Sequence, residues 1–164
     1  MTENETIKQL VLDLLRQMGF DAEVFERAEE GRTVFNVKTR DAQLLIGQKG
    51  ANLESLQHMV RILYRKQSGD ERFPYALDID DYKDKRVLYL KDLARKAAHH
   101  VRTNKKAVSL EAMPPHERRV VHSYLSLYSD IASESTGRDP QRKVIIKPKA
   151  KEKSADGFDF IENS

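Results

Sequence analysis

Two glycines three positions apart are the first feature of this sequence that could bind a ligand. Gly47-Gln48-Lys49-Gly50 stands between a short apolar stretch and a longer one with helical periodicity. Glycines permit a tight turn and leave no Cβ in the way of an approaching sugar-phosphate backbone. Backbone N–H groups and the positive end of the following helix would face an anion, and Lys49 adds a charge. A helix–helix turn that binds nothing is the alternative.

A second pair of residues, Arg118 and His122, stands four positions apart in a stretch with helical periodicity. Side chains at that spacing project from one face of a helix, about one turn apart. A guanidinium offers a planar fork of donors, and an imidazole can stack or donate, so the pair suits contact with phosphates or nucleotides. A surface pair without a function is the more common explanation of such spacing alone.

Charge is unevenly distributed along the 164 residues, whose 29 Lys/Arg and 26 Asp/Glu give a net charge of +3. Residues 1–82 hold 11 basic and 15 acidic side chains, residues 83–151 hold 17 and 7, and residues 152–164 hold 1 and 4. A segment as basic as 83–151 is typical of a module that meets phosphates. A solvated Lys-rich surface is the alternative.

Several classes of protein are disfavoured by what the sequence lacks. Without cysteine there are no disulfides, thiolate zinc sites or cysteine nucleophiles, and we find no Walker-type loop or nucleophile elbow. No apolar run reaches membrane length and no secretory signal is visible, so we expect a cytoplasmic protein.

The acidic cluster of Asp78, Asp80, Asp81 and Asp84 suits magnesium in a nuclease, but we favour a solvated domain junction. We predict no enzymatic activity, no cofactor and no metal.

Hydrophobic periodicity predicts the order α-β-β-α-α-β for a first domain at residues 1–81. Thr2 and Glu5 are spaced as a capping box at the start of the first helix. The expected elements are a helix that ends at Gly19, strands at 22–28 and 33–38, a short helical turn capped by Asp41, a helix that stops near Ser68-Gly69 and a strand at 75–79.

A second domain is predicted at residues 82–148, with helices packed on a small sheet, followed by a disordered tail at 149–164. Pro114-Pro115 should open its second helix, because a missing N–H costs nothing there. The expected elements are a helix at 82–103, a strand through Val108, Leu110 and Ala112, a helix that packs through Val120, Val121, Tyr124, Leu127 and Tyr128, and strands at 131–136 and 143–147.

The stretch LLIGQKGANLESLQHMVRILYRK, followed by LDIDDYKDKR, resembles the KH domain of the bacterial Jag (KhpB, EloR) family. The element order matches the type II arrangement of that fold. The resemblance implies that Gly47 to Gly50 clamp about four nucleotides and that Ile46 fixes the loop on the core. It also implies that bases rest in an apolar groove between the second helix and a neighbouring strand.

The stretch SLEAMPPHERRVVHSYL, with GRDPQRKVIIKPK downstream, resembles the domain that follows the KH domain in Jag proteins, named here the RxxxH domain. The resemblance implies that Arg118 and His122 are its signature residues. The further phosphate contacts that it suggests are Arg119, Lys105, Lys106, Arg142 and Lys143. Pro114 stands where relatives often carry Asn, which removes a capping side chain. We expect the chain to lack the family's N-terminal domain and its long linker.

The resemblance implies an α+β protein of two small domains that binds single-stranded RNA. It would be a post-transcriptional regulator or RNA chaperone linked to cell elongation or division. Single-stranded DNA is a second ligand to consider. A protein scaffold, in which the KH domain pairs with another KH protein or with a second copy of the chain and RNA affinity is incidental, is the alternative function. A metal-dependent nuclease is a third.

Overall fold

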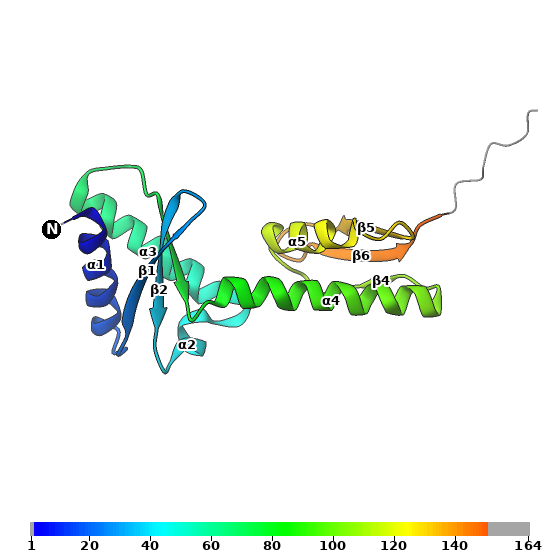
Figure 1. Cartoon of the computed structure of the whole chain (residues 1–164), viewed down its shortest axis with the longest axis horizontal. Helices are drawn as coiled ribbons and strands as arrows, with labels where there is room; N and C mark the ends of the chain where they lie inside the picture. Colours follow the sequence, from blue (N-terminus) through cyan, green and yellow to red (C-terminus); the bar gives the residue numbers. More distant parts are fainter. Residues whose placement is uncertain (1, 151–164) are drawn as a thin grey trace, which may run out of the picture. The chain divides into compact units, whose positions relative to one another are not determined.

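A computed structural model of the chain describes residues 2–150, which form two compact units (Figure 1). The first unit ends at Arg86 and the second begins at Val87, so the division falls inside helix α4 (Tyr82–Asn104). Each unit combines helices with one small sheet, which confirms the predicted α+β fold class. The predicted tail lies outside the described residues from position 151 onward.

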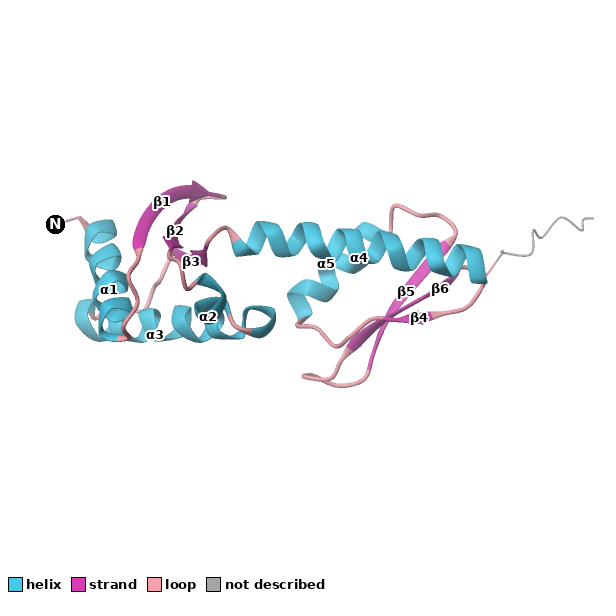
Figure 2. Ribbon diagram, turned by 90° about the horizontal axis from the view of Figure 1, so that it is seen from below, coloured by secondary structure: helices cyan, strands magenta, loops and turns pink. Residues whose placement is uncertain are grey.

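The first unit has the predicted α-β-β-α-α-β order. Its elements are α1 (Glu3–Gln17), β1 (Glu23–Glu29), β2 (Arg32–Lys38), α2 (Ala42–Ile46), the 3-10 turn η1 (Gln48–Gly50), α3 (Ala51–Ser68) and β3 (Tyr75–Ile79). The sheet order is β1-β2-β3, with β1 antiparallel and β3 parallel to β2. Figure 2 shows the three helices on one side of this sheet, where their apolar residues form a single core with alternate residues of the strands.

The ends of two helices in the first unit test the capping predictions. Thr2 Oγ1 accepts the Glu5 N–H at 3.2 Å and the Glu5 carboxylate accepts the Thr2 N–H at 2.6 Å, so the capping box is confirmed. Gly19 follows α1 with a φ of +85°. The prediction for Asp41 is wrong, because its side chain makes no capping hydrogen bond. Asp41 has a φ of −95° and a ψ of +27°, outside the extended region in which a side chain caps a helix.

The acidic cluster at the end of β3 is a solvated junction only in part, because the side chains of Asp80, Asp81 and Asp84 are 46%, 37% and 63% exposed but that of Asp78 is buried. Asp78 is 0% exposed, and its Oδ1 accepts the N–H groups of Ile79 at 2.9 Å and Lys83 at 3.3 Å. Arg27 Nη2 lies 3.5 Å from Asp78 Oδ2, and burial raises the pKa of the Asp78 carboxyl. Ion pairs from Arg27 and Lys38 to the cluster join β1 and β2 to the start of α4. No group of three or more His, Asp or Glu residues among 2–150 is placed to hold a metal.

The second unit continues from α4 and contains an antiparallel sheet of order β4-β6-β5. Its further elements are β4 (Val108–Ser109), α5 (Pro115–Leu125), β5 (Ile131–Thr136) and β6 (Lys143–Pro148). Both helices lie on one side of this sheet (Figure 2), and Val144 and Ile146 point into the core between them. No helix among residues 2–150 is both long and apolar enough to cross a membrane.

Two expectations for the second unit need correction. The strand predicted through Ala112 is only two residues long, because after Leu110, whose N–H donates to Val144 O at 2.9 Å, the chain turns toward α5. Leu127 is 76% exposed and does not pack on the core. The helix ends at Leu125, so helical spacing no longer determines the direction of the side chain two residues later.

Candidate nucleic-acid interface

The Gly47–Gly50 loop is a tight left-handed turn between α2 and α3. Gly47, Lys49 and Gly50 have φ values of +69°, +53° and +83°. Ile46 is buried in the core and fixes the start of the turn, whereas Gln48 is exposed and Lys49 half-buried at its tip. The turn leads into the N-terminus of an 18-residue helix, which favours anions. The geometry therefore presents a polar tip with one positive charge at a position that suits a phosphate.

The absence of side chains at the two glycines serves packing inside the unit. A Cβ on Gly47 would lie 2.5 Å from Asn52 Cγ, and one on Gly50 would lie 2.9 Å from Tyr82 Cε1. Asn52 is itself held in place, because its Nδ2 donates to Leu44 O at 2.8 Å. We expected open space for a sugar-phosphate backbone at these positions, but neighbouring side chains fill it. The surface that a ligand can reach is the Gln48-Lys49 tip.

The resemblance implied an apolar groove between α3 and a neighbouring strand, and the space between α3 and the adjacent strand β3 contains polar side chains. Gln57 Oε1 accepts the Leu77 N–H at 3.1 Å, so the edge of β3 is occupied at this residue. Lys83 Nζ donates to the same oxygen at 3.4 Å, and burial lowers the pKa of Lys83. The Arg61 guanidinium carbon lies 5.8 Å from the centre of the Phe73 ring. A base entering here would meet amide and cationic groups as well as apolar ones.

Arg118 points into the second unit. Its side chain is 9% exposed, and Nη1 donates both to Met113 O at 2.7 Å and to Asp139 Oδ1 at 2.6 Å. Nη2 donates to Asp139 Oδ2 at 3.3 Å, which completes a two-point contact. The Arg118 guanidinium holds the pKa of the Asp139 carboxyl below its usual value. Arg118 thus joins the start of α5 to the turn between β5 and β6.

His122, one turn further along α5, contacts β5. Its Nδ1 lies 2.7 Å from Ser133 Oγ and its Nε2 lies 2.7 Å from Ser135 Oγ. The two serines are alternate residues of one strand and share a face of the sheet. A neutral imidazole donates from one nitrogen and accepts at the other, and each hydroxyl can take the complementary role. Burial, with a smaller contribution from Arg118, lowers the pKa of His122 and favours this neutral form.

The second unit matches a known domain family. Residues 88–148 fit the family model of the R-3-H domain, the RxxxH domain of the sequence analysis, and they include Arg118 and His122 at the signature spacing. This part of the chain is an RxxxH domain. The prediction of such a domain is therefore confirmed.

The chain is also similar to proteins named "RNA-binding protein KhpB". The relative from Clostridium symbiosum is 34% identical over 148 residues, which cover 87% of this chain and 66% of the relative. The relative from Lactiplantibacillus plantarum is 31% identical over 147 residues (87% and 45%), and that from Bacillus subtilis is 32% identical over 124 residues (74% and 59%). This chain thus spans 45% to 66% of the lengths of these relatives. The matches support the assignment to the Jag/KhpB family.

Acidification is expected to destabilise the RxxxH domain through His122. Because its pKa in the folded protein lies below the ordinary value of 6.5, the unfolded chain binds the proton more readily. The stability that depends on neutral His122 is complete above about pH 6.5 and is lost as the pH falls through the lowered pKa. We expect the melting temperature, measured by circular dichroism, to fall between about pH 7 and pH 5.

The matched control is His122→Gln, whose side chain can still bond the two serine hydroxyls but does not titrate. Its melting temperature should change less over the same interval, and the difference from wild type isolates His122 from other titrating groups. Equal pH dependence in the two proteins would contradict the assignment.

Four of the five further cations that the resemblance implied lie at two ends of the second sheet, and the fifth, Arg119, is exposed on α5. Arg142 directly precedes β6, whereas Lys105 and Lys106 lie between α4 and β4. β4 runs antiparallel to β6, so Lys105 lies near the C-terminal end of β6, whereas Arg142 lies at its N-terminal end. A six-residue strand is about 20 Å long, and this length separates the two ends. Lys143 alternates with the buried Val144 and points away from the helices. The structure therefore separates these four cations into two groups.

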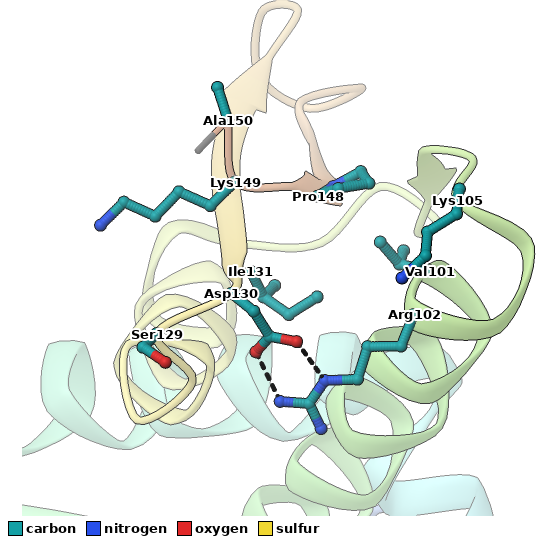
Figure 3. Close-up of a pocket in the computed structure, with 9 residues that line it drawn as sticks. All are labelled: Val101, Arg102, Lys105, Ser129, Asp130, Ile131, Pro148, Lys149 and Ala150. Atoms are coloured by element: carbon teal, nitrogen blue, oxygen red, sulfur yellow. Dashed lines mark hydrogen bonds and ion pairs between the residues drawn. The ribbon is translucent and has the colours of Figure 1, made fainter. Parts of the chain in front are cut away.

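Lys105 belongs to a cavity of about 570 Å³ at the end of β6 (Figure 3). Arg102 and Asp130 form a two-point ion pair there, with Nε–Oδ2 and Nη2–Oδ1 distances of 2.6 Å. Figure 3 shows the side chains of Lys105 and Lys149 extending in different directions. Because Asp130 balances one of the cations and the others diverge, the cavity does not present a focused anion site.

Sequence reasoning missed the inner partners of the signature residues. Asp139, Ser133 and Ser135 were not among the predicted site residues. One signal was available, because two serines that alternate on a strand with a buried first residue present hydroxyls to the covered face of the sheet. The role of Gln57 was likewise missed. A polar side chain close to the apolar face of a helix, as Gln57 is on α3, can accept a backbone N–H from the unpaired edge of a neighbouring strand.

Proposed function

We propose that this chain binds single-stranded RNA through a type II KH domain in its first unit and through the RxxxH domain. The observation that carries the proposal is the left-handed Gly47–Gly50 turn, which presents Gln48 and Lys49 at the N-terminus of α3 within an α-β-β-α-α-β unit. A tight loop of this kind, placed before a long helix, is how KH domains grip about four nucleotides. The parallel pairing of β2 and β3 is consistent with this fold.

The charge distribution supports an RNA ligand that spans more than the loop. Residues 83–151, which include the RxxxH domain, hold 17 basic and 7 acidic side chains. The exposed Arg119 on α5 and the partly exposed Arg142 and Lys143 are the cations that we assign to phosphate contact. The proteins named RNA-binding protein KhpB supply an independent reason for choosing RNA. In the cell, the protein would act as a cytoplasmic post-transcriptional regulator or RNA chaperone linked to cell elongation or division.

Fluorescence anisotropy with a labelled single-stranded RNA tests this proposal directly. We expect binding that weakens with salt, with a slope of log K against log salt of roughly −3 from about four phosphates held by the loop, and steeper if the cations of the RxxxH domain also contribute. A blunt, fully paired RNA duplex of the same length should bind more weakly, because its bases are not accessible. A single-stranded DNA of the same sequence measures the preference for RNA. The absence of RNA binding even at low salt would overturn the proposed function.

A further inference from the structure

We infer that Arg118 and His122 position the β5–β6 turn for RNA and do not contact RNA themselves; this inference rests on the proposed RNA-binding function. The spacing of the two residues suggested side chains displayed to a ligand. In the structure both are directed inward, and each bonds a different part of the β5–β6 hairpin.

The contacts of Arg118 leave its guanidinium poorly suited to meet a phosphate. With a side chain only 9% exposed, it donates to Met113 O and to both carboxylate oxygens of Asp139. Moving it to a ligand would break three hydrogen bonds and leave a buried carbonyl and a carboxylate without these donors. The Asp139 side chain is 53% exposed and water can replace its donors, but the guanidinium and the Met113 carbonyl are buried. Losing the bond to that carbonyl is therefore unfavourable, and the guanidinium is better understood as a fixed link.

His122 fixes the same hairpin at a second point. Both ring nitrogens are bonded to serine hydroxyls of β5, so neither is available to a nucleotide without breaking a contact. Arg118 therefore holds the turn that ends β5, and His122 holds the strand that leads into it. Two attachments to one helix restrain the hairpin more than either does alone.

The restrained turn is cationic on its outer side. Arg138 is exposed and Arg142 is partly exposed, and they flank Asp139. The turn is further ordered by internal bonds, since Gln141 N–H donates to Arg138 O at 2.9 Å and Arg142 Nη1 donates to Gly137 O at 3.4 Å. Because Arg118 neutralises Asp139, the two outer arginines face the solvent as a net positive pair. The geometry adds Arg138 to the residues that meet phosphate.

The variant Asp139→Asn separates positioning from direct contact, because the two roles predict opposite signs. If Arg118 binds phosphate, removing its carboxylate partner frees a cation and also removes a negative charge, so RNA affinity rises. If Arg118 positions the turn, the turn loosens and affinity falls, by roughly tenfold. The salt slope should also decrease in size by about 0.7 for each phosphate that Arg138 or Arg142 no longer binds.

Three further variants make the test specific. Asp139→Glu keeps the carboxylate and should recover most of the affinity. Arg118→Lys should weaken binding like Asp139→Asn, and the double variant should be no weaker than either, because both remove one link. Asp92→Asn removes the same charge from an ion pair with Arg95 and Lys96 on α4, and its affinity should equal or slightly exceed that of wild type. All are measured in the full chain at a temperature at which circular dichroism shows native helix content.

The outcomes are distinguishable. Failure of the wild type to bind RNA overturns the proposed function and this inference with it. Wild-type binding with unchanged or raised affinity in Asp139→Asn overturns the inference alone. Reduced affinity and salt slope in Asp139→Asn, with recovery in Asp139→Glu, support it.

Discussion

Replacing Gln48 and Lys49 by two aspartates is expected to abolish RNA binding while the protein remains folded. The exchange removes one positive charge and adds two negative charges at the tip of the loop, where the helix end otherwise attracts a phosphate. We expect affinity for single-stranded RNA to fall by at least roughly a hundredfold. The fold should tolerate the change, because Gln48 is exposed and aspartate is among the residues that accept the left-handed backbone of Lys49.

The matched control replaces the same two residues by asparagine, which has nearly the shape of aspartate without its charge. This control loses only the lysine charge, so its affinity should lie between those of wild type and the aspartate variant. Anisotropy measures the affinity, and thermal unfolding by circular dichroism shows that both variants are folded. Unchanged RNA affinity in the aspartate variant would exclude the loop as the binding site.

Gly47→Ala is expected to destabilise the first unit and to weaken RNA binding as well. The new methyl group would lie 2.5 Å from Asn52 Cγ, and the φ of +69° is unfavourable for alanine. Strain of this kind costs about 1–3 kcal/mol in the free energy of unfolding, which urea denaturation measures. RNA affinity should fall because the loop must shift to accommodate the methyl group.

Two variants separate the two causes. Gly31→Ala, in the β1–β2 turn, has a similar φ of +79° but no heavy atom within 4 Å of the new Cβ, so it measures the backbone strain alone. Asn52→Ala removes the side chain that Gly47→Ala would meet, together with its hydrogen bond to Leu44 O. The double variant at 47 and 52 should be less destabilised than the sum of the single ones. Additive effects, or a Gly47→Ala protein as stable as wild type, would show that the loop has room for a side chain.

The helices and strands were largely predictable because each has a local signal in the sequence. Periodicity of 3.6 residues marked α1, α3 and α4, and alternation marked β1 and β2. The capping box of Thr2 and Glu5 and the proline pair before α5 were also local signals, and both were confirmed. Predictions were wrong where a pattern was extended beyond its element, as at Leu127, or where a charged cluster was assumed to be solvated, as at Asp78.

The sequence by itself determined the order of the elements, the α+β class, the tight glycine loop and the presence of Arg118 and His122 one turn apart on α5. Only the tertiary structure decided what these side chains touch. Spacing along a helix defines which face a residue occupies, but the partners on that face come from distant segments, such as Asp139 in the β5–β6 turn. The same reason applies to Gly50, whose missing side chain makes room for Tyr82. Local periodicity carries no information about which remote residue will fill a given space.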